Sequence, residues 1–178
     1  SLLLALITVL GSLFLSTLAG YGFARFKFRG RGLFFGLILL MIMVPFQALL
    51  TPIYFIFSQV GLQNSLIGLS LIYITYQLPF SIFLMRNTFM SIPVALGEAA
   101  MIDGCSPFKT FRSVMLPLAK PGIISVALFA FFASWNEFIA ALSLISVQEK
   151  YSLPVVLTLL GDRQMGATNF GFLQAGVV

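Results

Sequence analysis

Glu98–Pro117 reads EAAMIDGCSPFKTFRSVMLP and carries charges of both signs in a chain that is otherwise strongly apolar. It holds two of the five acidic residues and two of the ten basic residues. A charged, helix-permissive stretch between two long apolar segments indicates a loop that faces water and offers a surface to another molecule. The segments on either side decide the solvent in which the chain folds.

The composition places this loop in a membrane protein. The 178 residues are 60% hydrophobic and 8% charged, whereas soluble domains contain about 25% charged residues. A bilayer is the solvent that accommodates so much apolar surface. Histidine is absent, which excludes histidine-dependent nucleophile pairs and metal motifs. The lone Cys105 excludes an internal disulfide, and we expect this thiol to be inert.

Four apolar segments are long enough to cross a bilayer core about 30 Å thick. They cover residues 2–23, 33–57, 65–84 and 122–145. The sequence therefore predicts an all-α membrane protein, a polytopic helical bundle with four full spans. Because the chain starts in an apolar segment and turns apolar again at 171–178, we expect a fragment truncated at both ends, finishing at the start of another span.

Basic residues predict the orientation of these spans. Eight of the ten Lys and Arg residues lie in the loops at 24–32 and 86–121, which the parity of the spans places on one side. Cytoplasmic loops carry the excess of basic residues. We therefore expect a multi-pass protein of the bacterial inner membrane, with both loops in the cytoplasm and residues 147–170 outside.

Pro45 interrupts the second apolar segment, where it removes a helix hydrogen bond and predicts a bend. Two interpretations stay open. The bend serves packing against neighbouring helices, or it shapes a pathway for a solute, which the adjacent Gln47 favours.

Capping residues predict that the charged loop forms two short helices. Ser91 is the expected N-cap of the first, with Pro93 in its first turn. Gly104 is placed to end that helix in the left-handed conformation. Ser106 and Pro107 give the same start signal for the second helix.

We expect Pro117 to stop the second helix. Its apolar stripe consists of Phe108, Phe111 and Met115. Helices this short are marginal alone, so they need either the bilayer surface or a partner protein to pack on. A DNA-binding helix-turn-helix does not fit, because the helices are too short and too close to the membrane.

The loop resembles the EAA loop of binding-protein-dependent ABC importer permeases in three parts with matching spacing, Glu98-Ala99-Ala100, Asp103-Gly104 and Val114-Met115-Leu116-Pro117. Further stretches resemble the carbohydrate, maltose-type branch of that family: YGFARFKFRGR at 21–31, Met-Val-Pro at 43–45, SWNEF at 134–138 and YSLP at 151–154. The resemblance covers essentially the whole chain. It implies a single MetI-like transmembrane domain over 1–178, with a coupling loop at 86–121.

The resemblance also implies a role for the loop, namely docking in a groove of a separate cytosolic ATPase subunit. Glu98 would pair with a basic residue of that subunit, and Gly104 would allow close contact. The residues expected to take part in ATPase coupling are Glu98, Ala99, Ala100, Asp103, Gly104, Phe108, Phe111, Met115, Leu116 and Pro117.

Polar residues at membrane depth are functional candidates, because burying a charge in a bilayer is costly. The candidates for a wet translocation pathway are Gln47, Tyr76, Gln77, Asn136 and Glu137. A structural role stays open for Glu137, which could reach the outer interface or pair with another helix. Trp135 is interpreted as an interface anchor more readily than as a sugar-stacking ring.

The polar run GDRQMGATN at 161–169 has no core pattern. In the resembling family, the corresponding outer loop contacts the extracellular substrate-binding protein. Asp162, Arg163 and Gln164 are the candidates for that contact, and a solvated connector is the alternative.

No phosphate-binding motif of the type GxxxxGK[ST] occurs, so we expect no ATP hydrolysis by this chain and no cofactor or metal. The resemblance implies two ATPase subunits, a second homologous permease subunit, an extracellular or periplasmic binding protein and a sugar or oligosaccharide as the solute, without nucleic acid. A membrane enzyme is not favoured, because the sequence has no histidine, no paired carboxylates within a span and no Gly-x-Ser-x-Gly motif. An ion-coupled secondary transporter stays the alternative, although it would be expected to show repeated halves with broken helices.

Overall fold

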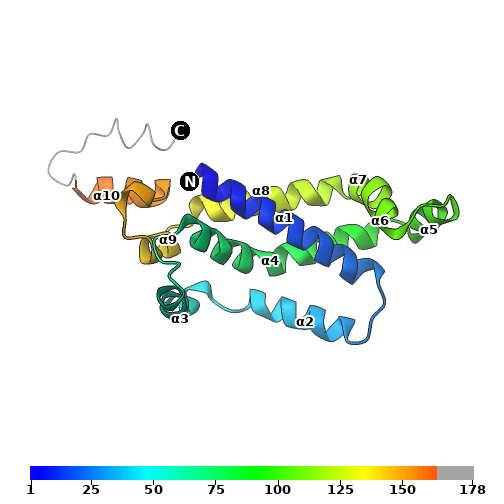
Figure 1. The fold of residues 1–178 in the computed structure, drawn as a ribbon, viewed down its shortest axis with the longest axis horizontal. Helices are drawn as coiled ribbons and strands as arrows, with labels where there is room; N and C mark the ends of the chain where they lie inside the picture. Colours follow the sequence, from blue (N-terminus) through cyan, green and yellow to red (C-terminus); the bar gives the residue numbers. More distant parts are fainter. Residues whose placement is uncertain (164–178) are drawn as a thin grey trace. The chain divides into compact units, whose positions relative to one another are not determined.

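The computed structural model describes residues 1–163, which fold into helices without a strand (Figure 1). The order along the chain is α1 Leu2–Arg25, α2 Arg31–Ile42, α3 Phe46–Gln59, α4 Leu66–Ser91, α5 Val94–Ile102, α6 Pro107–Thr110, the π-helix η1 Phe111–Met115, α7 Leu116–Leu118, α8 Lys120–Asn136, α9 Ile139–Leu144, the 3-10 helix η2 Gln148–Lys150 and α10 Leu153–Arg163. The predicted all-α polytopic fold is confirmed.

Two of these helices, α1 and α4, are long and apolar enough to cross a membrane by themselves. Two further pairs qualify if each is taken as one span broken at a short interruption, α2 with α3 and residues 107–118 with α8. The described residues thus contain two spans, or up to four by length and composition. The first and third predicted segments are single helices, and the second and fourth are not.

The expected bend at Pro45 is a complete break. Helix α2 ends at Ile42, and α3 begins at Phe46, with Pro45 in an extended conformation at its N-cap position. Pro52 lies inside α3 without ending it. The fourth predicted segment, 122–145, is also divided, because α8 ends at Asn136 and α9 begins at Ile139.

The start of the charged loop was predicted too early. Helix α4 continues to Ser91, since no helix breaker occurs between residues 84 and 91. Ser91 does not cap the next helix; its hydroxyl donates to the Thr88 carbonyl oxygen at 2.8 Å. Pro93 takes the N-cap position of α5 instead. The loop between the long helices therefore runs from residue 92 to residue 119.

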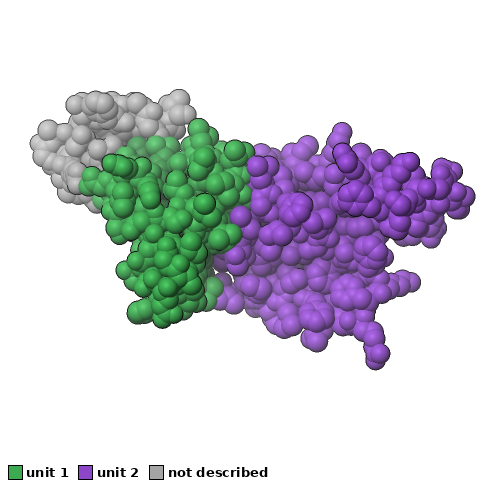
Figure 2. Space-filling model, viewed as in Figure 1, with its two compact units in different colours: residues 1–8, 45–73, 131–178 green, residues 9–44, 74–130 purple. Residues whose placement is uncertain are grey.

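The chain divides into two compact units (Figure 2). The first unit contains residues 1–8, 45–73 and the chain from residue 131, and the second contains residues 9–44 and 74–130. The core of the first unit is built from Leu4, Phe46, Leu69, Ile72, Tyr73, Ala140, Ala141, Leu144, Ile145 and Val155. The core of the second is built from Met85, Phe89, Ile92, Met115, Ala119 and Val126.

Within the second unit, glycines let α1 and α8 approach α4 closely. A methyl group at Gly20 would lie 2.6 Å from the Met85 Cβ and 2.9 Å from the Arg86 backbone nitrogen. A methyl group at Gly122 would overlap the Thr88 side chain. Lipid tails are as apolar as Leu, so the hydrophobic effect does not drive helices together inside a membrane. Small residues, which let helix backbones approach closely, are therefore favoured where membrane helices pack. The two contacts fix the end of α4 from which the charged loop departs.

Candidate functional site

The first loop helix, α5, ends as its sequence predicts. Gly104 has φ of 82°, the left-handed region that glycine adopts without strain. The Cys105 N–H donates to the Ala100 carbonyl oxygen at 3.0 Å, and the Gly104 N–H donates to the Met101 carbonyl oxygen at 3.0 Å. These two bonds form a Schellman motif that satisfies the carbonyls at the end of α5. The chain then reverses sharply toward the second loop helix.

The second loop helix begins with the predicted cap. The Ser106 Oγ accepts a hydrogen bond from the Lys109 N–H at 3.3 Å, and Pro107 occupies the first turn. This helix does not stop at Pro117, as was expected, but continues through α7 to Leu118. The π-helix before it shifts the bonding pattern, with the Leu116 N–H donating to the Phe111 carbonyl. A proline, which has no N–H, is accommodated just after that shift.

The predicted apolar stripe of this helix divides into two environments. Met115 is buried and Phe111 is half-buried, and both pack in the core of the second unit. The Phe111 ring lies 4.7 Å from the Tyr21 ring between centroids. Phe108, in contrast, is 70% exposed. Two of the three residues therefore brace the chain's own helices, and one faces outward.

Small residues of the EAA segment face the second loop helix. Gly97 and Ala100 are buried, and a methyl group at Gly97 would lie 2.7 Å from the Met115 Cε. Glu98 and Ala99 of the same helix are exposed. Asp103 is exposed at the C-cap, Leu116 is half-buried and Pro117 is exposed. The small buried residues Gly97 and Ala100 thus let α5 lie against its neighbour, while Glu98 stays exposed.

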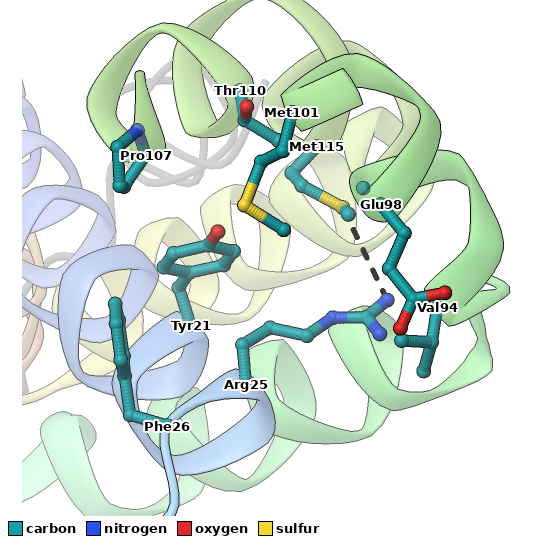
Figure 3. Close-up of a pocket in the computed structure, with 10 residues that line it drawn as sticks. Tyr21, Arg25, Phe26, Val94, Glu98, Met101, Pro107, Thr110 and Met115 are labelled. Carbon is teal, nitrogen blue, oxygen red and sulfur yellow. Dashed lines mark hydrogen bonds between the residues drawn. The ribbon is translucent and has the colours of Figure 1, made fainter. Parts of the chain in front are cut away.

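Glu98 also lines a pocket of about 230 Å³ between the end of α1 and the loop (Figure 3). The pocket is lined among others by Tyr21, Arg25, Met101, Thr110 and Met115. Figure 3 shows Arg25 reaching from α1 toward the loop helices, where it bonds the Met115 sulfur.

Several exposed apolar residues of the loop were not selected from the sequence. Ile102 is 86% exposed at the tip of α5. Val94, Leu96 and Met101 are 59%, 44% and 51% exposed on the same helix. The available signal was that α5, VALGEAAMI, is apolar around most of its circumference, so one face of it had to remain uncovered.

Glu137 occupies the break between α8 and α9, where its carboxylate accepts three hydrogen bonds. The donors are the Tyr73 hydroxyl at 2.6 Å and the backbone N–H groups of Ala140 at 2.9 Å and Ala141 at 3.2 Å. The carboxylate therefore satisfies free donors at the start of α9. A structural role for Glu137 is present, and its role in a pathway stays a prediction.

The other pathway candidates are distributed over both units. Gln47 and Asn136 are exposed in the first unit, where the Asn136 amide donates to the Phe132 carbonyl at 2.9 Å. Tyr76 is exposed and Gln77 is buried in the second unit. Trp135 stacks on Phe131, with 5.3 Å between ring centroids.

The candidates for binding-protein contact lie at the limit of the described chain. Asp162 and Arg163 are the last residues of α10. Gln164 lies outside the described residues. Within residues 1–163, no group of three or more Cys, Asp or Glu side chains is arranged to hold a metal ion.

Comparison with known proteins places the chain in a family. Residues 3–177 match the family model described as binding-protein-dependent transport system inner membrane component. The chain is 35% identical over 175 residues to the trehalose transport system permease protein SugB of Mycobacterium tuberculosis (strain CDC 1551 / Oshkosh), which covers 98% of this chain and 64% of that protein. It is 35% identical over 178 residues to the diacetylchitobiose uptake system permease protein NgcG of Streptomyces coelicolor (strain ATCC BAA-471 / A3(2) / M145), covering 98% of this chain and 59% of that protein.

A third relative is the osmoprotective compounds uptake permease protein GgtD of Synechocystis sp. (strain ATCC 27184 / PCC 6803 / Kazusa), 39% identical over 128 residues, or 72% of this chain and 43% of that protein. The chain thus spans less than two thirds of the length of these three relatives. The family model covers nearly all of the chain, and the EAA segment with its Schellman turn lies inside the match. The chain therefore belongs to the family of membrane components of binding-protein-dependent transport systems.

Proposed function

We propose that the chain is the permease subunit of an ATP-binding-cassette importer, and that the loop at 92–119 couples it to a separate cytosolic ATPase. One observation carries this proposal. Ile102 and Phe108 are 86% and 70% exposed on a loop in which Phe111 and Met115 pack against the chain's own helices. Exposed apolar side chains beside a charge, here Glu98, are typical of a protein-docking patch.

The same proposal includes the assembly and its orientation. Residues 1–178 form one transmembrane domain of the bacterial inner membrane, with the loop in the cytoplasm, as the basic residues indicate. Two ATPase subunits, a second homologous permease subunit and an extracellular binding protein complete the importer. Family membership supports a binding protein, which the description of the family names, and an ATPase as the general partner of such permeases.

We propose a sugar or oligosaccharide as the solute. Two of the relatives are named for trehalose and diacetylchitobiose. The proposed pathway residues are Gln47, Tyr76, Gln77, Asn136 and Glu137, and the proposed binding-protein contacts are Asp162, Arg163 and Gln164.

The coupling role is tested by Glu98→Ala in the complete importer reconstituted in liposomes. Removal of a charge-assisted contact should lower binding-protein-stimulated ATP hydrolysis and solute uptake by about ten- to hundredfold, because such contacts stabilise by about 1.5–3 kcal/mol. Glu149→Ala is the matched control, since Glu149 is an exposed acidic residue of η2 on the predicted outer side. Equal activity of both variants would contradict the coupling role of Glu98.

A further inference from the structure

Arg25, the last residue of α1, binds the end of α4 from which the loop departs. Its Nη2 donates to the Phe89 carbonyl oxygen at 2.8 Å and to the Ile92 carbonyl oxygen at 2.5 Å. The same nitrogen lies 4.0 Å from the Met115 sulfur in the second loop helix (Figure 3). One guanidinium therefore contacts Phe89 of α4, Ile92 at the start of the loop, and Met115 of the second loop helix.

The sequence explains why α4 needs an external donor here. In a continuing α-helix, the Phe89 carbonyl would accept from the N–H of residue 93. Residue 93 is proline, which has no N–H. Carbonyls at a helix C-terminus also carry partial negative charge, so a cation is the favoured partner. Arg25 supplies the donor and the charge that Pro93 leaves unmet.

Aromatic contacts bring the same three elements together beside Arg25. The Tyr21 ring, one turn before Arg25 in α1, lies 5.2 Å from the Phe89 ring of α4 and 4.7 Å from the Phe111 ring of the loop, between centroids. Phe89 is fully buried. The cytoplasmic ends proposed for α1 and α4 and the second loop helix thus share one packed junction.

We propose that Arg25 is a positioning residue that makes the loop, α1 and α4 move together, so that displacement of the loop by its ATPase reaches the membrane helices. This rests on the proposed coupling function. Arg25 itself does not need to touch the ATPase, because its guanidinium is engaged within the chain. The inference distinguishes a residue that docks the ATPase, such as Glu98, from one that transmits the docked motion.

The first test compares Arg25→Met with the unchanged importer in liposomes. Methionine keeps much of the apolar length and removes every donor. We expect the ATPase subunits to co-purify normally, while solute uptake per ATP hydrolysed falls about tenfold, the size expected for one charge-assisted bond. Unchanged uptake per ATP overturns the proposal, and so does loss of ATPase binding. Failure of the unchanged chain to bind an ATPase would instead contradict the proposed function.

The double variant Arg25→Met/Pro93→Ala separates transmission from local repair. Alanine restores an N–H that can bond the Phe89 carbonyl without any link to α1. We expect Arg25→Met to lower thermal stability, because the Phe89 carbonyl loses its donor, and the double variant to recover that stability while coupled uptake stays low. Recovery of uptake along with stability would show that Arg25 only satisfies a carbonyl, which overturns the proposal.

A distance measurement tests the link without relying on transport. Cys105 is the only cysteine of the chain, and a second label can be placed by Gly22→Cys, since a Cβ at Gly22 meets no atom within 4 Å. With Arg25 present, electron paramagnetic resonance of the two spin labels should give one narrow distance before and after ATP binding. In Arg25→Met the distribution should broaden or shift with ATP. The same narrow distribution in both proteins overturns the proposal.

Discussion

Phe108 and Phe111 lie one turn apart in the second loop helix and have different neighbours. Phe108 is 70% exposed, whereas Phe111 packs against the rings of Tyr21 and Phe89 at 4.7 and 6.3 Å between centroids. Chemistry and helix are the same for both, so the difference in environment assigns their roles: Phe111 stabilises the loop against the chain, and Phe108 is available to a partner.

Alanine substitutions should separate these roles. Phe111→Ala removes packed aromatic surface and should destabilise the protein by about 2 kcal/mol, below the cost for a fully buried ring. Phe108→Ala should leave thermal stability in detergent unchanged and weaken co-purification of the ATPase. The assignment is wrong if Phe108→Ala melts at a lower temperature than Phe111→Ala.

At Glu137 the carboxylate holds a helix break together through three donors. Glu137→Ala leaves the Tyr73 hydroxyl and two N–H groups of α9 without their partner, and should cost about 3 kcal/mol, because unsatisfied buried groups are expensive. Tyr73→Phe removes one donor and should cost about 1 kcal/mol. Thermal melting of both variants checks the order, and an equal or reversed order would refute the capping role.

At the scale of elements, the close contact of α1 with α4 depends on glycine. Gly20→Ala places a methyl group 2.9 Å from the Arg86 backbone nitrogen, so one helix must shift. Gly22→Ala, two residues further along α1, meets nothing within 4 Å. We expect Gly20→Ala to destabilise the protein by about 1–3 kcal/mol and Gly22→Ala to stabilise it by about 0.5 kcal/mol, because alanine favours helix. Melting temperatures that fall equally in both variants would disprove close packing at Gly20.

The sequence predicted those structural features that depend only on interactions between residues close together in the chain. Gly104 and Ser106 fixed the turn between the loop helices, because left-handed glycine and serine caps act on their own backbone. The continuation of α4 to Ser91 and of the second loop helix past Pro117 was missed. A capping residue can end a helix or lie inside one, and tertiary packing decides between them.

Contacts distant in sequence could not be predicted from one chain. The capping of α9 by Glu137 needs Tyr73 from α4, and the Arg25 junction joins residues 64 to 90 positions apart. The apolar segment around Glu137 predicted that it lies at membrane depth, and the basic run around Arg25 predicted a loop. Neither pattern indicates which distant residue the side chain contacts. The candidate coupling residues came from the resemblance of the loop to the EAA loop of a known family, and their division into exposed and bracing side chains required the structure.

At the scale of the whole molecule, we propose that an apolar chain offers the exposed tip of its charged loop to a partner. Up to four broken or continuous spans embed it in the bilayer. Phe111, Met115 and Arg25 hold the loop between α4 and α8 against the chain's own helices, and in the proposed coupling these contacts would carry a displacement of its tip to the membrane helices. The central claim is that this tip, with Ile102 at its end, binds a cytosolic ATPase.

A photo-crosslinking amino acid placed at Ile102 tests that claim most directly, with Val147 as the control position, because Val147 is 38% exposed on the predicted outer side. In membranes that contain the assembled importer, the probe at position 102 should crosslink to the ATPase subunit, and the probe at 147 should not. Absence of an ATPase crosslink from position 102, or an equal crosslink from 147, would contradict the coupling role of the loop.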